Sequence, residues 1–438
     1  MNRLEAAWSR KRLALTFGAQ IYNQIVTLLV QLALVPILLH QWGAQRYGVW
    51  LLLSAVPSYL VFADFGFTLS AKNELTTSVA SGDHKRAIHI YQSTFALLNI
   101  VVFVVLAILF SAISPSNLAH TFSLGEVSGE SATRILLFLA GNVLLNQYLL
   151  LFAAGLRASG RPAEEVLWNA SSRLAEGIVT IIAATLSNDL PTTALTIFLC
   201  RGGIAILVWV RLRTVAGWLQ LGFTYVSLSE VRRLAAPSFA FLAQSFAQVL
   251  LIQGPVVLLG SLTNPLAVAT FSTCRTLVRL GTTAANLLNA TFIPEYTRLY
   301  ASSRSLLWAT FRWHVLATGF MLAGYIALLV SSGEYVLHVW TKDRIHAGYP
   351  WFFLMILAAS SEMAWTTAAM PILAINRHVR LSYAYLAVSF ICLASQAAAL
   401  ERFGLNAVAI SLLVAHGTML IVVAFDIRKQ FCQETIQK

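Results

Sequence analysis

The sequence predicts an all-α integral membrane protein with about twelve transmembrane helices in two six-helix lobes. Apolar residues make up 58% of the 438 residues and charged residues only 11%, and the mean hydropathy is +0.72. A soluble globular protein does not have this composition. Apolar windows of about twenty residues, the length of helix that crosses a bilayer, recur from one end of the chain to the other.

Twelve windows meet this criterion, and short segments join them. The first six form an N-terminal lobe, 1–210, and the last six a C-terminal lobe, 236–438, with a cytoplasmic linker at 211–235. The expected limits of the spans are 15–39, 48–70, 87–113, 134–156, 166–186, 192–210, 236–260, 267–293, 308–331, 349–375, 381–400 and 404–425.

The net charge of +12 separates by side of the membrane. With a cytoplasmic N-terminus, twenty of the thirty Lys and Arg residues fall in cytoplasmic segments. The opposite loops hold five, and five lie within spans. The positive-inside rule therefore predicts that both termini are cytoplasmic. Because this excess follows from topology, it gives no support to nucleic-acid binding.

The eighth predicted span carries two arginines near its middle. Arg275, Arg279, Thr282, Asn286 and Asn289 are spaced four, three, four and three residues apart, which places them on one face of a continuous helix. An arginine at the bilayer centre costs at least about 2.5–3.5 kcal/mol. Snorkelling to the headgroups and pairing with a carboxylate are two explanations. A cationic, water-filled cavity that binds an anionic substrate is the third, and we favour it.

Uncharged polar stripes mark two further spans. Hydroxyl and amide groups on one face of span one suit either hydrogen bonds between helices or a cavity wall, and span seven has a similar face. An alignment of span one with span seven places Arg275 and Arg279 opposite Ser54 and Ser58, so the positive face belongs to the second lobe alone. The polar residues are Gln20, Asn23, Gln24, Thr27 and Gln31 in span one and Gln244, Gln248 and Gln253 in span seven.

Other charges also fall inside predicted spans. Three carboxylates, Asp64, Glu176 and Glu362, are candidates for coupling transport to an ion gradient. Arg173 and Glu176 are three residues apart on one helix, and we expect them to pair with each other. The remaining arginines, Arg201 and Arg312, are structural or cavity charges without an assigned partner.

Several chemistries are missing from the sequence. It contains no P-loop or other glycine-rich phosphate cradle, so ATP is not expected to drive the protein directly. The four cysteines have no metal-ligand spacing, and we expect free thiols and no metal. No Ser/His/Asp set falls in one accessible loop. These patterns predict a protein that is not an enzyme and needs no cofactor.

A series of short motifs carries a family resemblance. A Gly–Tyr-Gly-x-Trp turn at Gly43–Trp50 precedes an Asp-x-Gly at Asp64–Gly66. Motifs at 293–296, 335–340, 373–377 and 403–407 follow in order. Together they resemble Wzx-type polysaccharide and O-antigen flippases of the multidrug/oligosaccharidyl-lipid/polysaccharide (MOP) exporter superfamily. Many relatives have Gly-Ala where this chain has Asn406-Ala407.

The resemblance implies a MATE/MurJ-like fold and a bacterial inner-membrane transporter. The implied cargo is a polyprenyl-pyrophosphate-linked oligosaccharide, and a glycan polymerase is a conceivable partner. The arginines of span eight would bind pyrophosphate, and the amides of spans one, seven and eight would bind sugar hydroxyls. A cation-coupled multidrug antiporter of the same superfamily is the first alternative. A membrane-embedded glycan polymerase or ligase, with 334–346 as its outer loop, is the second.

Overall fold

The structure, a computed structural model, describes residues 3–64, 66–112, 114–302, 304–374 and 379–428. Throughout these ranges the chain forms helices and turns without a β-strand. This confirms the predicted all-α class. Cys432 and the Asn376–Arg377 part of one motif lie outside the described residues.

Nine of the described helical segments are long and apolar enough to cross a membrane. One of them, Leu15–Phe62, contains the first predicted span and the larger part of the second. Helix α6 (Pro162–Ser187), the fifth predicted span, is not among the nine. The eighth predicted span is divided into two helices. These three differences separate the nine segments from the twelve expected spans.

Helix α1 (Arg3–Ser58) is interrupted at a single residue, Gly43, whose φ of 71° and ψ of 170° are not helical. Glycine adopts a positive φ without the steric cost that a Cβ brings. Trp42 and Trp50, on either side of this glycine, lie with their ring centroids 5.2 Å apart. The turn expected at Gly43–Trp50 is therefore confined to one residue.

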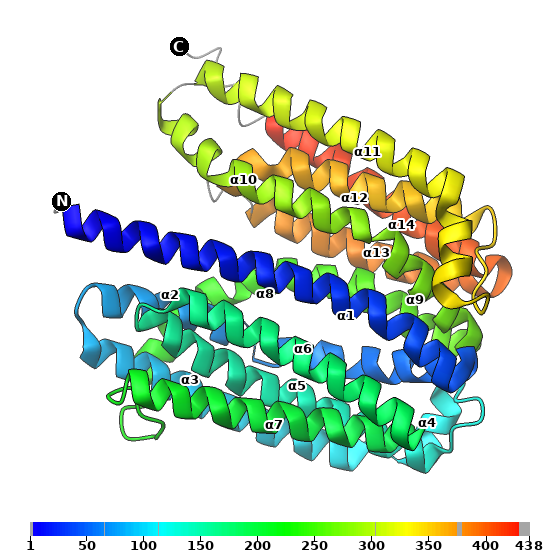
Figure 1. Cartoon of the computed structure of the whole chain (residues 1–438), viewed down its shortest axis with the longest axis horizontal. Helices are drawn as coiled ribbons and strands as arrows, with labels where there is room; N and C mark the ends of the chain where they lie inside the picture. The colour runs from blue at the N-terminus through cyan, green and yellow to red at the C-terminus, as the bar shows by residue number, and fades with distance from the viewer. Residues whose placement is uncertain (1–2, 65, 113, 303, 375–378, 429–438) are drawn as a thin grey trace. The chain divides into compact units, whose positions relative to one another are not determined.

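The chain divides into two compact units, Met1–Leu242 and Ala243–Lys438, and the division falls inside helix α8 (Leu228–Leu262). In the first unit, α5 packs against α2, α3, α4, α6 and α7, and α1 lies along α6 (Figure 1). The helices after α1 are η1 (Tyr59–Phe62), α2 (Phe67–Ala80), α3 (His84–Ala112), α4 (Pro115–Thr121), α5 (Gly129–Ala158), α6 and α7 (Leu190–Val215).

The linker between α7 and α8 is fixed to α3. Gln92 donates from Nε2 to the Gln220 carbonyl at 3.1 Å and accepts from the Tyr225 backbone N–H at 2.8 Å. Ser227 donates its backbone N–H to the Ser93 hydroxyl at 2.8 Å. The irregular part of the predicted linker thus covers 216–227, and its ends belong to α7 and α8.

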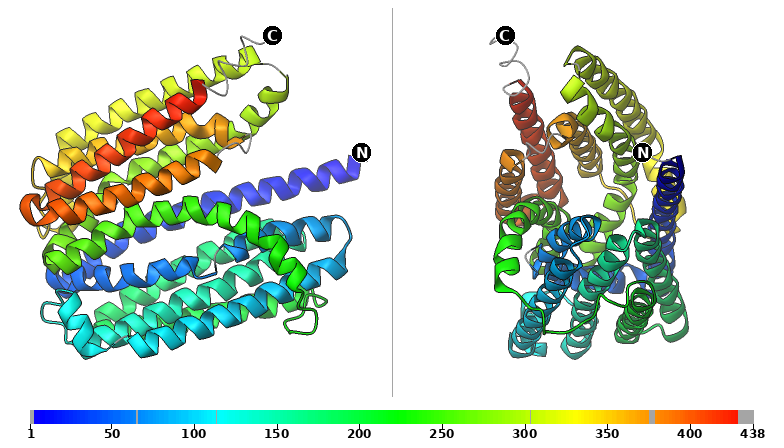
Figure 2. Two further views of the ribbon diagram at one scale, coloured as in Figure 1. Left: turned by 180° about the vertical axis from the view of Figure 1, so that it is seen from behind. Right: turned by 90° about the vertical axis from the view of Figure 1, so that its left-hand side faces the viewer.

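In the second unit, α12 (Trp351–Ala374) is the central helix and contacts α9, α10, α11 and α14 (Figure 2). Met355, Ile356 and Met363 on this helix are buried. Their packing fixes the position of α12 and of the polar side chains on it. Its neighbours are α9 (Pro265–Val278), α10 (Leu280–Ser302), α11 (Arg304–Thr341) and α14 (Leu405–Ile427), and α13 (Val379–Phe403) packs on α14.

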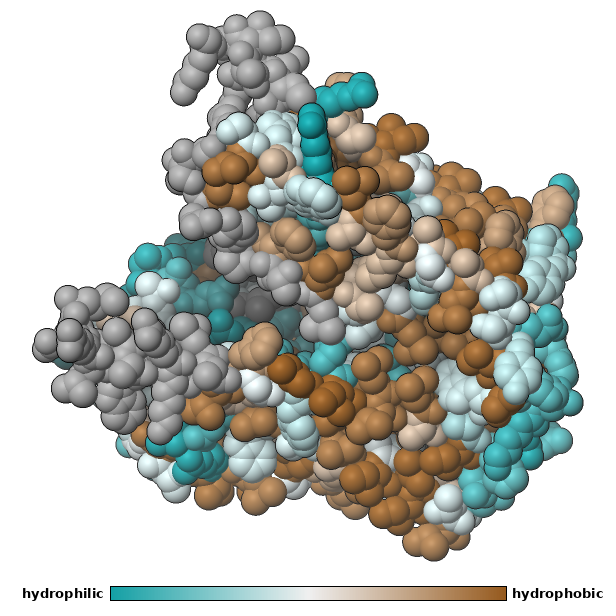
Figure 3. Space-filling view, turned by 45° about the horizontal axis from the view of Figure 1, so that its top comes forward, coloured by the Kyte–Doolittle hydropathy of each residue, from teal (hydrophilic) through white to brown (hydrophobic). Residues whose placement is uncertain are grey.

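Large apolar side chains lie exposed along many of these helices. Phe103, Leu186, Phe320 and Ile421 are more than 70% exposed, and Figure 3 shows apolar residues covering much of one face of the molecule. Exposure on this scale is costly in water and favourable in lipid. The protein is therefore a multi-pass membrane protein.

Candidate functional site

The two arginines singled out in the sequence lie at a helix break. Helix α9 ends at Val278, Arg279 is its C-cap, and α10 begins at Leu280. The prediction of one continuous helix over 267–293 is therefore wrong. The Thr282 N–H, which would bond the Val278 carbonyl in an α-helix, instead bonds the Arg279 carbonyl at 3.1 Å.

A tyrosine from α11 satisfies the carbonyls that the break releases. The Tyr325 hydroxyl donates to the Val278 carbonyl and lies 3.4 Å from that of Leu277. Gly281 makes room for it, because a Cβ there would come within 2.6 Å of the Tyr325 ring. The polar groups of the break are thus paired inside the protein, as the interior of a membrane requires.

Arg279 forms a two-pronged ion pair with Glu362 of α12. Its Nη1 and Nη2 atoms donate to Oε2 and Oε1 at 2.6 and 3.1 Å. The Arg279 side chain is 28% exposed and the Glu362 side chain 11% exposed. Planar guanidinium and carboxylate groups fit each other in this arrangement, which also suits phosphate. The carboxylate therefore occupies the part of Arg279 that an anionic ligand would use.

His416 of α14 lies on the other side of this carboxylate. Its Nε2 is 3.8 Å from Glu362 Oε2, and its Nδ1 accepts a hydrogen bond from Trp365 Nε1 at 3.2 Å. An indole N–H can only donate, so Nδ1 must be the unprotonated nitrogen. His416 is consequently neutral, with its N–H at Nε2 directed toward Glu362.

Arg275 lies one turn before Arg279 and makes different contacts. Its Nη1 donates to the Ile252 backbone carbonyl of α8, and its guanidinium lies 5.3 Å from the centre of the Phe271 ring. The carbonyl dipole and the ring face hold the guanidinium at the wall of the cavity. Arg275 and Arg279 therefore bring two cationic groups to a cavity whose described lining residues include a single carboxylate.

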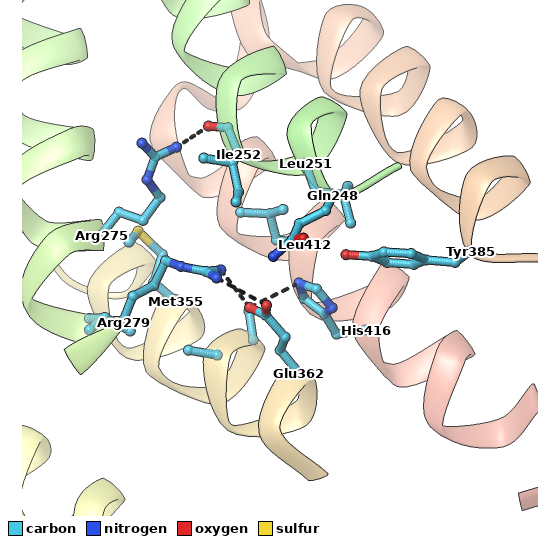
Figure 4. A pocket seen from close by; sticks show the side chains of 13 residues that line it. Gln248, Leu251, Ile252, Arg275, Arg279, Met355, Glu362, Tyr385, Leu412 and His416 are labelled. Atoms are coloured by element: carbon cyan, nitrogen blue, oxygen red, sulfur yellow. Dashed lines mark hydrogen bonds and ion pairs between the residues drawn. The ribbon is translucent and has the colours of Figure 1, made fainter. Parts of the chain in front are cut away.

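This first cavity holds ≈ 30 Å³ of space, room for about two water molecules. Figure 4 shows Arg275, Arg279 and Glu362 around it, with the Tyr385 hydroxyl pointing toward them. Gln248 of α8, one of the predicted substrate contacts, lines it as well. The ion pair between Arg279 and Glu362 thus fills most of the site.

A second and larger cavity, of ≈ 180 Å³, shares Tyr385 with the first. It contains the predicted substrate residues Gln244 and Asn286. Asn289 lies deeper, where its Oδ1 accepts from the Thr367 hydroxyl of α12 at 2.9 Å. The lining residues of the second cavity are Gln244, Asn286, Trp365, Thr366, Met370, Leu373, Leu381, Ser382 and Tyr385.

The polar face of α1 lies in the first unit, and part of it contacts α6. Arg173 Nη1 donates to Asn23 Oδ1 at 3.4 Å and to the Thr27 hydroxyl. Gln24 is half-buried, whereas Gln20 and Gln31 are exposed. Of the predicted substrate residues of α1, Asn23 therefore bonds to a cation of its own unit, Arg173.

The expected pair between Arg173 and Glu176 does not form. Glu176 instead pairs with Arg201 of α7, whose Nη2 donates to Glu176 Oε2 at 2.7 Å while its Nε lies in ion-pair contact with Oε1. Arg201 also donates to Asn146 Oδ1 at 2.8 Å and to the Ser172 hydroxyl at 3.1 Å. A bidentate partner on a neighbouring helix satisfies more of the carboxylate than an arginine three residues away can.

Asp64 and Arg312 are placed apart from both groups. The carboxylate oxygens of Asp64 accept backbone N–H groups of Gly66 and Thr68 at 3.0 and 2.9 Å, so Asp64 caps the start of α2. Arg312 is exposed on α11. In the described ranges, His, Cys, Asp and Glu residues do not gather in threes as a metal site requires.

Three residues of the second unit's site were missed in the sequence: Trp365, Tyr385 and His416. His416 had a usable signal, because a histidine inside the apolar run of α14 is an intramembrane ionisable group. The aromatic residues had none, since Trp and Tyr are common in membrane helices.

No protein-family model matches this sequence, and no curated protein matches it significantly. Solved structures do resemble it. An inward-facing multidrug resistance MATE family transporter of the MOP superfamily matches with a TM-score of 0.69 and 14% identity, over 94% of this chain and 98% of that one. The MATE multidrug transporter DinF-BH matches with a TM-score of 0.67 and 14% identity, over 95% of each chain.

The lipid II flippase MurJ, in an inward closed conformation, also matches. The TM-score is 0.66 at 12% identity, over 95% of this chain and 87% of that one. At such identities the likeness shows the fold, and it confirms the predicted all-α membrane transporter fold. These neighbours are transporters or flippases and not enzymes.

Proposed function

We propose that this protein is a flippase for a polyprenyl-diphosphate-linked oligosaccharide, such as an O-antigen, capsule or exopolysaccharide repeat unit. It would carry the headgroup from the cytoplasmic to the outer leaflet of the bacterial inner membrane by alternating access. The main support is the presence of Arg275 and Arg279 at a helix break inside the transporter fold. Broken helices of this kind form substrate sites in many transporters.

The balance of charge in the site favours an anionic cargo. Arg275 and Arg279 line the first cavity together with one carboxylate, Glu362, among its described residues. A diphosphate supplies several acceptor oxygens to which guanidinium groups bind in pairs. Amide groups at Gln244 and Asn286 in the neighbouring cavity donate and accept hydrogen bonds, as sugar hydroxyls do.

Glu362 is an internal competitor for the substrate anion. Its carboxylate engages the two nitrogens of Arg279 that a phosphate would bind. A diphosphate that enters must displace it, and an unpaired buried carboxylate is costly. A proton taken up by Glu362 would remove that cost. Glu362 is therefore the residue that we propose couples cargo binding to a proton gradient.

The sequence supports the proposed orientation in the membrane and the proposed class of cargo. The distribution of Lys and Arg supports cytoplasmic termini, and the motif series resembles Wzx-type flippases. A glycan polymerase at the outer leaflet would consume the product. The lipid tail would stay in the bilayer throughout, and no cofactor takes part.

The test is made in a strain that lacks the gene. We expect surface polysaccharide to be lost and the lipid-linked repeat unit to accumulate on the cytoplasmic face, with both defects corrected by the wild-type gene. The Arg275→Ala/Arg279→Ala variant, expressed to the same level, should fail to correct them. Normal flux through this variant would exclude the site. Repeat units that reach the outer face in the deletion strain would exclude the function.

A cation-coupled multidrug antiporter is the second candidate, and one observation favours it. Glu362 is buried near the rings of Trp365 and Tyr385, and a carboxylate beside aromatic rings suits an organic cation. The ion pair with Arg279 opposes this use of the carboxylate. Normal surface polysaccharide together with new sensitivity to cationic drugs in the deletion strain would identify the antiporter.

A further inference from the structure

The described lining of the second cavity holds no charged side chain, although the cavity adjoins the first one with its two arginines and Glu362. Its polar groups are amides and hydroxyls, from Gln244, Asn286, Thr366 and Ser382. The remaining wall is aromatic and aliphatic. Small-molecule sites commonly combine an apolar wall with a few polar groups that fix orientation.

We propose that this second cavity is a saccharide subsite that binds the sugar ring next to the diphosphate. The inference rests on the proposed function and adds which part of the cargo the cavity contacts. Because the lining is neutral, the sugar at this position is an uncharged one, and any acidic sugar of the repeat unit lies elsewhere.

The aromatic wall fits one face of a sugar ring. Trp365 and Tyr385 lie with ring centroids 5.0 Å apart at 54°, and each is 5% exposed. The Trp365 N–H is already used by His416, so the ring faces and edges are what remain for a ligand. A sugar presents C–H groups on its ring faces, and these pack against aromatic surfaces.

The amides can receive the hydroxyl rim of the same ring. The Asn286 side chain is exposed and makes no hydrogen bond within the described part of the chain. Gln244 accepts a long hydrogen bond from Ser382 at 3.4 Å, which leaves its amide donors available. The Thr366 hydroxyl donates to the Glu362 and Met363 carbonyls and can still accept.

The size and position of the cavity set the order of the groups that it would bind. A volume of ≈ 180 Å³ exceeds the roughly 150 Å³ of an engineered cavity that binds benzene, so the cavity has room for one six-membered ring. Tyr385 lines both cavities, so a ligand that occupies the two in sequence has its charged group at Arg279 and its ring beside Trp365. A sugar diphosphate has this order.

The experiment compares two ligands with the purified protein in nanodiscs. One is a short-chain polyprenyl diphosphate. The other is the same lipid carrying one sugar, taken from a panel of glucosyl, galactosyl and N-acetylglucosaminyl forms. We expect the best glycosylated form to bind about tenfold more tightly, the effect of one or two added hydrogen bonds.

Two variants separate the cavities. In Gln244→Ala/Asn286→Ala the tenfold preference for the glycosylated lipid should disappear, while affinity for the sugar-free lipid stays at the wild-type value. Gln248→Ala is the matched control, because Gln248 is one turn from Gln244 on α8 but lines the other cavity. It should keep the preference.

The outcomes distinguish this inference from the function on which it rests. An unchanged preference in Gln244→Ala/Asn286→Ala would overturn the saccharide subsite and leave the flippase intact. Equal binding of the sugar-free lipid and all glycosylated forms by the wild type would overturn the subsite too. Failure of the wild type to bind any diphosphate lipid would overturn the proposed function itself.

Discussion

Arg279 and Glu362 are 83 positions apart in the chain, yet both guanidinium nitrogens at the end of Arg279 bond to the two oxygens of Glu362. The pair joins the break between α9 and α10 to the central helix of the second unit. It also gives the site an internal anion. The stability of the unit and its affinity for an external anion therefore depend on the same contact.

Removal of the Glu362 charge should change stability and affinity in opposite directions. Glu362→Gln leaves Arg279 partly buried without a counter-ion, and we expect the free energy of unfolding to fall by about 3 kcal/mol. Affinity for inorganic diphosphate should rise, because the ligand no longer competes with a carboxylate. Thermal melts in detergent and isothermal titration measure the two quantities.

The control for this prediction removes the whole pair. Arg279→Met/Glu362→Met should retain nearly wild-type stability, since two apolar groups replace a buried ion pair at little cost, but should lose diphosphate binding. If Glu362→Gln bound diphosphate more weakly than the wild type, Glu362 would be a supporting contact and not a competitor.

In the first unit, Glu176 should matter more for stability than Arg173. Glu176→Gln deprives Arg201 of its counter-ion, whereas Arg173→Gln removes an exposed side chain bonded to neutral groups. We expect unfolding to become easier by about 3 kcal/mol in the first variant and by less than about 1 kcal/mol in the second. If melting experiments showed the same loss of stability in both variants, they would support a pair between Arg173 and Glu176, as the sequence spacing suggested.

Gly281 is expected to tolerate no Cβ. The methyl group of Gly281→Ala would meet the Tyr325 ring at 2.6–2.8 Å, and overpacking of this kind costs about 1–3 kcal/mol. Displacement of Tyr325 would also free the Val278 carbonyl. Gly324→Ala on α11 is the control, because nothing lies within 4 Å of its Cβ position. It should be neutral or stabilising by up to about 1 kcal/mol, as measured by thermal melts.

The tautomer of His416 should depend on Trp365. In the wild type, ¹⁵N NMR of labelled histidine should show the Nε2–H form at His416, assigned by the loss of its signals in His416→Gln. Trp365→Phe removes the only N–H of that side chain and should yield a mixture of tautomers. A pure Nδ1–H form in the wild type would contradict the hydrogen bond from Trp365.

The fold class could be predicted from composition, because lipid-facing helices must be apolar along their whole length. The break at Arg279 could not. Neither a proline nor a glycine occupies position 279, and the break depends on Tyr325, which comes from another helix. Arg275 and Arg279 line one cavity, since a single turn separates Arg275 in the last turn of α9 from Arg279 at its C-cap.

Ion-pair partners were less accessible to sequence analysis. Spacing suggested Glu176 for Arg173, but Arg201 binds Glu176 from the neighbouring helix. Local spacing identifies which residues can meet within one helix, and it carries no information about which helix packs alongside. The same limit applies to His416, whose proximity to Glu362 depends on the packing of α14 against α12.

The salt bridge between Glu176 and Arg201 has a consequence for biosynthesis. Helix α6 is not apolar enough to count among the candidate membrane spans, and α7 carries Arg201 in its interior. Because only a short turn joins the two helices, they can leave the translocon as a hairpin in which Glu176 and Arg201 already neutralise each other. We therefore expect α6 to enter the lipid together with α7, so that a helix poorly suited to cross alone is inserted by the one that follows it.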